Sequence, residues 1–231
     1  MIKGILMDLG GTVYENKNYS FDAIIDKVYE LNKNNTVSKK KFLEINKHLK
    51  KITYDNRKEN EIRFLDYLHY LQDYCDLVFS KSLEEIEVEV VLSTVDTEII
   101  DGIIDVLKYC MESNIKVVAV SNSMFSKIVI LKQLELLNLT PYFYKILVSS
   151  EYLFRKPSHV FFELAIKIID LKIEEILFVG NDYKCDVIGP NELGIKSCWF
   201  NINKEVNYRR VDTLEIHNYK RLIKYLKAEW L

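Results

Sequence analysis

The stretch Gly4-Ile5-Leu6-Met7-Asp8-Leu9-Gly10-Gly11-Thr12 predicts a short buried strand that delivers an aspartate into a glycine turn. A carboxylate at the end of a buried strand loses hydration unless a cation or hydrogen-bond donors meet it. Ligands of open α/β sheets bind where strands end. We therefore interpret Asp8 as the centre of a site, although an aspartate at a turn can also serve only to form that turn.

Composition sets broad limits on the partners. The chain has 231 residues, of which 48% are hydrophobic, and a formal net charge of −2. This balance predicts no nucleic acid and no membrane as partner, and no apolar run approaches the ~20 residues of a membrane span. The chain opens on a strand and its four cysteines form no CxxC pattern, so we expect no signal peptide, reduced thiols and a cytoplasmic location. Nothing in the sequence indicates the oligomeric state.

The segment after the glycine turn has helical character. Residues 19–95 contain neither glycine nor proline, and their apolar residues recur at helical spacing. This pattern predicts an all-helical insert of about four helices, with Ser38 as the cap of one of them.

Strands and helices alternate from about residue 97 onward. Such alternation predicts right-handed βαβ units and a parallel sheet with helices on both faces. The fold class is thus α/β, a Rossmann-like parallel sheet core (residues 1–15 and 96–231) with an inserted all-helical cap domain (residues 16–95) that covers the site as a lid. We expect helices over 99–111, 125–137, 160–169 and 219–226, and strands over 117–120, 146–148, 176–180, 197–200 and, less clearly marked, 212–216.

Polar residues follow four of the predicted strands. Asp8 follows the first, Ser121-Asn122 the second and Lys156 the third, whereas Asp182 and Asp186 follow the fourth. Three carboxylates at close range need a cation, and hard oxygen ligands suit Mg²⁺. A hydroxyl donor and an ammonium beside them complete a site for covalent phosphoryl transfer.

Four motifs in this order resemble the haloacid dehalogenase superfamily, in the branch with a helical cap between its first two motifs. They are Asp8-Leu9-Gly10-Gly11-Thr12, Ser121-Asn122, Arg155-Lys156-Pro157 and Gly180-Asn181-Asp182 with Asp186.

The resemblance implies a role for each matching residue. Asp8 would be the nucleophile and a metal ligand, with the Gly10 carbonyl, Asp182 and Asp186 as further ligands; Asn181 can also be aligned with the first acidic position, but a carboxylate holds Mg²⁺ better. Ser121 would bind the transferring group, and Lys156 would neutralise charge. We expect Gly11, Thr12 and Asn122 to contact substrate, and interpret Arg155 as solvated.

Gly10 departs from the family pattern. Phosphatases of this family usually carry there an aspartate that protonates the leaving group and then activates water. The substrate could instead have a good leaving group, such as an acyl or anomeric phosphate. Alternatively, Tyr14, Glu15, His48 or His69 could replace the missing group, or turnover is lost.

The prediction is a Mg²⁺-dependent hydrolase that acts on a small phosphorylated molecule through an aspartyl-phosphate on Asp8. The alternatives are a catalytically weak binding or regulatory protein on the same fold, which the glycine favours, and a carbon–phosphorus hydrolase with a cap lysine. The fourth-motif carboxylates argue against a dehalogenase, because the halide branch usually lacks them.

Overall fold

The central element of the fold is a six-stranded, wholly parallel sheet in the order β5-β4-β1-β6-β7-β8. The computed structural model describes residues 1–206 and 211–228. The strands of this sheet are β1 (Gly4–Met7), β4 (Lys116–Ser121), β5 (Lys145–Val148), β6 (Ile176–Gly180), β7 (Lys196–Phe200) and β8 (Leu214–Ile216).

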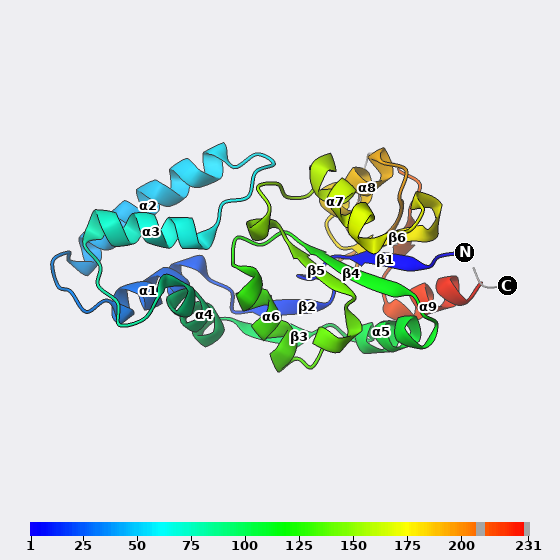
Figure 1. Cartoon of the computed structure of the whole chain (residues 1–231), viewed down its shortest axis with the longest axis horizontal. Helices are drawn as coiled ribbons and strands as arrows, with labels where there is room; N and C mark the ends of the chain where they lie inside the picture. Colours follow the sequence, from blue (N-terminus) through cyan, green and yellow to red (C-terminus); the bar gives the residue numbers. More distant parts are fainter. Residues whose placement is uncertain (207–210, 229–231) are drawn as a thin grey trace.

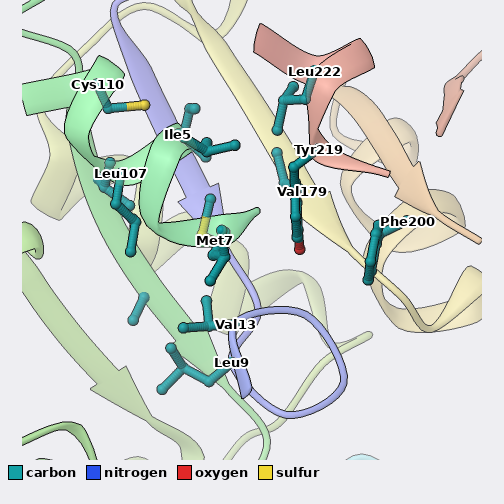
Figure 2. Close-up of a cluster of buried hydrophobic side chains, with 14 of the residues drawn as sticks. Ile5, Met7, Leu9, Val13, Leu107, Cys110, Val179, Phe200, Tyr219 and Leu222 are labelled. Atoms are coloured by element: carbon teal, nitrogen blue, oxygen red, sulfur yellow. The ribbon is translucent and has the colours of Figure 1, made fainter. Parts of the chain in front are cut away.

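Alternate residues of the central strands pack into two different core layers. Ile5 and Met7 of β1 belong to the layer under helices α5 (Ile103–Glu112), α6 (Lys127–Leu136) and α9 (Tyr219–Ala228), which Figure 2 shows in part. Leu6, between them, faces the opposite layer under α7 (His159–Ile169). Successive side chains of a strand point to opposite faces of the sheet, and both faces are covered by helices. Residues on both sides of these strands are therefore apolar, and the strands appear in the sequence as continuous apolar runs.

Four helices stand apart from the sheet at one end of the molecule (Figure 1). They are α1 (Phe21–Leu31), α2 (Lys39–Asn56), α3 (Phe64–Cys75) and α4 (Leu83–Thr94), and they bury a core of their own. Ser38 caps α2 by accepting a hydrogen bond from the Lys41 amide, as predicted. The α/β class and the all-helical character of the insert are therefore confirmed.

A second, two-stranded sheet connects the helical insert to the core. Strand β2 (Tyr14–Lys17) pairs antiparallel with β3 (Asp96–Ile99), and their register ends on the pair Lys17 and Asp96. The expected helix start at Ile99 was wrong, because that residue belongs to β3 and α5 begins after Gly102, whose φ is +80°. Both strands are short and half-exposed, so they lack the apolar alternation that marks a strand.

The remaining elements are short. They comprise α8 (Gly189–Glu192), a π-helical turn (Tyr183–Ile188), and 3₁₀ turns at Thr140–Tyr142, Ser149–Glu151 and Ile173–Glu175. All four cysteines are free thiols, as expected. Within residues 1–206 and 211–228, no helix has the length and apolarity needed to span a membrane.

Candidate active site

Three neighbouring strands carry the site at their carboxyl ends. In the sheet, β1 lies between β4 and β6, so Asp8, which follows β1, stands between Ser121 at the end of β4 and Gly180 at the end of β6. The Asp8 amide donates to the Val179 carbonyl at 2.9 Å, which fixes the start of the turn against β6. Residues that are far apart in sequence thus reach one edge of the sheet, as the strand-end argument required.

Lys156 links two of the predicted carboxylates. Its Nζ lies 2.7 Å from Asp8 Oδ1 and 2.7 Å from Asp186 Oδ1, and its side chain is only 1% exposed. Burial alone would lower the pKa of Lys156, but the carboxylates of Asp186 and Asp8 outweigh burial and raise that pKa above its ordinary value. The ammonium therefore stays charged beside Asp8.

Asp186 is buried, like Lys156, and is fixed by contacts on both of its side-chain oxygens. Its second oxygen, Oδ2, accepts from the Asp182 amide at 3.0 Å, and burial raises the pKa of its carboxyl although Lys156 opposes that shift. Its carboxylate lies against Gly180, where any side chain would collide with it. Glycine is thus required at the end of β6 by close approach rather than by backbone conformation.

A cavity of about 520 Å³ opens over these groups. Its walls include Asp8, Ser121 and Lys156 of the core, together with Tyr19, Tyr54, Arg57, Val91 and Val95 of the helical insert. The insert therefore forms part of the wall opposite the strand ends, where a lid was expected.

Two of the residues expected to contact substrate, Asn122 and Thr12, have hydrogen-bond partners within the protein. The Asn122 amide is occupied by the Lys156 backbone, donating to its carbonyl at 2.9 Å and accepting from its N–H at 2.8 Å. Thr12 is fully buried, donates to Asn181 Oδ1 at 3.2 Å and does not line the cavity. Asn122 lines the cavity together with Gly11, but its amide is engaged in positioning Lys156.

The three carboxylates predicted as metal ligands do not form one cluster. Within the described ranges, no three His, Cys, Asp or Glu side chains gather closely enough to hold a metal ion. Asp182 Oδ1 instead accepts from the Cys185 amide at 2.8 Å, which caps the π-helical turn. The Asn181 side chain lies against the Gly10-Gly11 turn, within 2.5 Å of where a Cβ on Gly11 would stand. Both Asn181 and Asp182 line the cavity, and the contact with the glycine turn favours the alignment that places Asn181 first.

Gly10 faces open space. A Cβ built on it would meet nothing within 4 Å, and its φ is not in the left-handed region, so no backbone or packing constraint demands glycine there. Among the four suggested replacements for the missing acid/base group, only Tyr14 lines the cavity. Burial, with a smaller effect of Asp8, raises the pKa of Tyr14 above its ordinary value, so Tyr14 is a poor proton donor or acceptor near neutrality.

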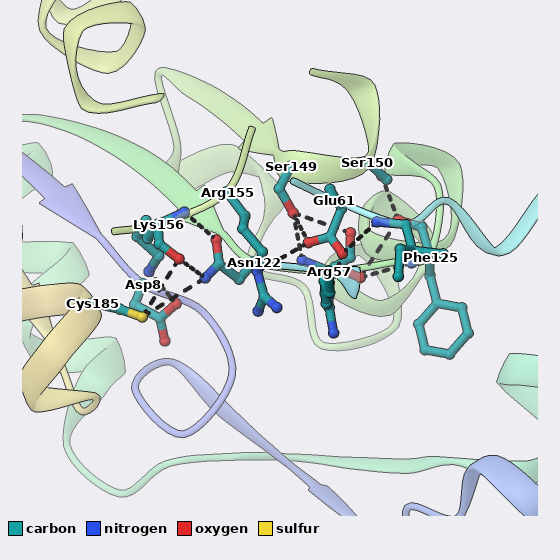
Figure 3. A network of polar contacts seen from close by, with 12 residues as sticks. Asp8, Arg57, Glu61, Asn122, Phe125, Ser149, Ser150, Arg155, Lys156 and Cys185 are labelled. Carbon is teal, nitrogen blue, oxygen red and sulfur yellow. Dashed lines mark hydrogen bonds and ion pairs between the residues drawn. The ribbon is translucent and has the colours of Figure 1, made fainter. Parts of the chain in front are cut away.

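One charged cluster was not anticipated from the sequence. Glu61 pairs with Arg57 and with Arg155, whose Nε lies 3.5 Å from Glu61 Oε2, and the Glu61 side chain is 1% exposed (Figure 3). Ser149, after β5, donates to the same oxygen at 2.5 Å. Arg155 is thus paired and only partly exposed, and the interpretation of it as solvated was wrong. The charged residues around position 60 do not indicate in the sequence that Glu61 contacts Arg155, which lies 94 residues away.

A family model settles the classification. The model of the haloacid dehalogenase-like hydrolases matches residues 2–194. The chain belongs to this family of hydrolases.

Two curated proteins are similar over part of the chain. A pyrimidine 5′-nucleotidase of Streptococcus pneumoniae is 29% identical over 87 residues, which are 37% of this chain and 37% of that protein. A ribulose-1,5-bisphosphate 5-phosphatase of Halopiger xanaduensis is 35% identical over 75 residues, 32% of this chain and 31% of that protein. The chain thus matches about a third of the length of each of these relatives.

Solved structures show the same fold over nearly the whole chain. A HAD phosphatase from Thermococcus onnurineus superposes with a TM-score of 0.70 at 21% identity, covering 97% of this chain and 98% of the other. The putative HAD-hydrolase YfnB of Bacillus subtilis, bound to magnesium, gives a TM-score of 0.61 at 20% identity, with 97% and 98% covered. At these identities the likeness concerns the fold.

Proposed function

We propose that this protein hydrolyses a small phosphorylated molecule, with Asp8 as the nucleophile. The observation that carries the proposal is the position of Lys156 Nζ at 2.7 Å from both Asp8 and Asp186, at the base of a cavity. A charged ammonium beside the carboxylate of Asp8 offers a positive charge to phosphoryl oxygens.

The covalent step follows from these groups. Asp8 attacks phosphorus through a carboxylate oxygen, the bond from phosphorus to the ester oxygen breaks, and the leaving group departs with the electron pair. Ser121, buried at the end of β4 and lining the cavity, donates its hydroxyl to a phosphoryl oxygen. Water then attacks phosphorus, the bond from phosphorus to the Asp8 oxygen breaks, and dihydrogen phosphate leaves with both protons of the water and with the Asp8 carboxylate restored.

The residues present fit a divalent cation. Asp8 and Asp186 place carboxylate oxygens beside the ammonium of Lys156, and Gly10 and Asn181 add neutral oxygens at the same edge. We propose Mg²⁺ bound by Asp8 and the Gly10 carbonyl, with Asp186 directly or through water, and with Asn181 in the place first given to Asp182. Mg²⁺ would supply positive charge to the phosphoryl oxygens.

The substrate needs a leaving group that departs with little protonation. Gly10 supplies no acid, and Tyr14 remains protonated near neutrality. Acyl and anomeric phosphates, whose leaving groups are weaker bases than a simple alkoxide, meet this requirement. The phosphatase and nucleotidase names of the two curated relatives support phosphate ester chemistry, and the four free thiols support a cytoplasmic location.

One alternative keeps support from the structure and one does not. The empty space at Gly10 favours a binding or regulatory protein with weak turnover. A carbon–phosphorus hydrolase would need a cap lysine at the site, and none lines the cavity in the described part of the insert.

The test is a phosphatase assay with acetyl phosphate and p-nitrophenyl phosphate, with and without Mg²⁺. We expect metal-dependent turnover that Asp8→Asn abolishes and that Asp66→Asn, an exposed control on α3, leaves unchanged. Equal rates for the parent and Asp8→Asn would overturn the proposal.

A further inference from the structure

The Arg57–Glu61–Arg155 cluster carries more positive than negative charge. Two guanidinium groups meet a single carboxylate, and both oxygens of that carboxylate are already engaged. Glu61 Oε1 also accepts from the Ile62 amide at 3.0 Å, and Oε2 accepts from Ser149. Glu61 therefore offsets one of the two guanidinium charges, and Asp182, which lines the same cavity, offsets part of the charge of Arg155.

The two arginines also have hydrogen-bond donors to spare. Each guanidinium has five N–H groups in a planar fork. Among residues 1–206 and 211–228, the Nε atoms of both arginines are buried without a hydrogen-bond partner, and the Nη groups of Arg155 make no hydrogen bond. Both side chains line the same cavity as Asp8. Free Arg155 Nη donors and two guanidinium groups in the wall of a cavity are the features of an anion site.

The cluster is held rigidly between the helical insert and the loop that carries Lys156. The Glu61 amide donates to the Leu153 carbonyl at 2.8 Å, and the Arg155 amide donates to the Glu59 carbonyl at 3.0 Å. The Arg57 guanidinium lies 5.7 Å from the centre of the Tyr54 ring, which also lines the cavity. These contacts fix both guanidinium groups before any ligand arrives, so little ordering is needed on binding.

We propose that Arg57 and Arg155 form a second anion subsite, which binds a carboxylate or second phosphate at the far end of a substrate whose transferring phosphate lies at Asp8. This inference rests on the proposed function and adds the substrate class, a phosphate ester with a second anionic group. Figure 3 shows Arg155 standing between Asn122 and Arg57, on the path from Asp8 to Glu61.

The test compares three sugars as competitive inhibitors of p-nitrophenyl phosphate hydrolysis, so that the leaving groups of the sugars do not enter the comparison. Glucose 6-phosphate has no second anionic group, 6-phosphogluconate has a carboxylate, and glucose 1,6-bisphosphate has a phosphate. We expect the parent to bind one or both doubly anionic sugars with a lower Ki than glucose 6-phosphate, and the preferred one identifies the anion. A hydrogen bond to a charged group accounts for roughly a ten- to hundredfold effect, so Arg57→Gln and Arg155→Gln should each reduce that preference in Ki by this factor.

The matched control is Arg63→Gln. Arg63 belongs to the same segment, but it is exposed and pairs with Asp66 at 3.9 Å, outside the cavity. This variant should keep the parent's preference. Thermal unfolding of all variants separates a binding effect from a loss of fold, because a purely structural role would raise Ki for all three sugars equally.

Calorimetric binding to Asp8→Asn separates the two proposals. If this variant binds a doubly anionic sugar more tightly than glucose 6-phosphate, and the parent shows no turnover, then the subsite stands and the proposed function fails. If the parent turns over p-nitrophenyl phosphate in an Asp8-dependent way but neither assay shows a preference, the subsite is overturned and the proposed function stands.

Discussion

Gly10 and Gly11 are neighbours in sequence, but a side chain would meet different surroundings at each. Gly11 has a φ of +78° and lies against the Asn181 side chain, so both its backbone and its contacts require glycine. Gly10 has neither constraint. The missing side chain at position 10 is therefore a chemical feature of the site and not a requirement of the turn.

Replacement of Gly10 tests how much acid/base chemistry the site lacks. Gly10→Asp places a carboxylic acid in the open space, and general acid–base help typically contributes about 10²–10⁴-fold. We expect a gain in kcat within that range for an alkyl phosphate, whose leaving group needs a proton, and a smaller gain for acetyl phosphate. Steady-state assays with the two substrates measure it.

Gly10→Asn is the matched control, because it has the same size without an ionisable proton. It should show no gain. An unchanged rate for Gly10→Asp with the alkyl phosphate would mean that another group already supplies the proton, which would contradict the absence of an acid at this site.

At the scale of elements, the sequence predicted the buried apolar strands of the parallel sheet and the polar residues at their carboxyl ends. Strand β1 was predicted from its short apolar run. Asp8, which follows it, was identified as a site residue because a carboxylate at the end of a buried strand needs a partner. Strands β2 and β3 were missed because they are short, polar and half-exposed. The pairing of Glu61 with Arg155 was also missed, because charged residues in a helical insert are usually solvated and the segments meet only in the fold.

Asp182 shows the limit of argument from residue type. A carboxylate is the better Mg²⁺ ligand than an amide, so Asp182 was preferred over Asn181. Aspartate is also a favoured residue at helix starts, and in the structure its side chain caps the turn that begins at Tyr183. That second preference was visible in the sequence, and local backbone geometry decides between the two.

Helix α4 of the insert is linked to α6 of the core by a buried carboxylate. Glu87 Oε1 accepts from the Ser126 amide at 2.9 Å, whereas Glu87 Oε2 and Ser126 Oγ are buried without partners among the described residues. Burial raises the pKa of Glu87, although the bonds to Ser126 oppose it. The folded state therefore holds this proton to higher pH than the unfolded chain does, and the free energy of unfolding falls as pH rises from 4.5 through the raised pKa.

Glu87→Gln should remove this pH dependence. The amide keeps the acceptor for Ser126 N–H and adds a donor toward Ser126 Oγ, so we expect a free energy of unfolding about 1 kcal/mol higher at pH 7. Urea unfolding at pH 5 and pH 8 measures the effect, with Glu44→Gln as an exposed control that pairs only with Lys41. The same decline with pH in parent and Glu87→Gln would show that Glu87 does not titrate as described.

At the scale of the whole molecule, we propose that residues 16–95 form a cap domain on a core made of residues 1–15 and 96–231. The pairing of Lys17 with Asp96 at the end of the β2–β3 ladder brings the two boundaries of the insert together. The insert has its own buried core, to which Met124, Phe125 and Val129 are the buried residues contributed by the described part of the main body.

This division predicts that the core folds without the insert. An Asn-Gly turn joining Lys17 directly to Asp96 suits a two-residue hairpin between antiparallel strands. With Met124, Phe125 and Val129 changed to Gln, Ser and Thr, we expect one cooperative thermal transition by circular dichroism and loss of any preference for doubly anionic sugars. A chain without a cooperative transition would contradict the division into two domains.

The central claim is that Asp8 becomes phosphorylated during turnover. Borohydride reduces an acyl phosphate on aspartate to homoserine, which peptide mass spectrometry can locate. The account predicts homoserine at position 8 when the enzyme is quenched during turnover of acetyl phosphate or p-nitrophenyl phosphate, and none without substrate. Steady turnover with residue 8 unmodified at every quench time would contradict it.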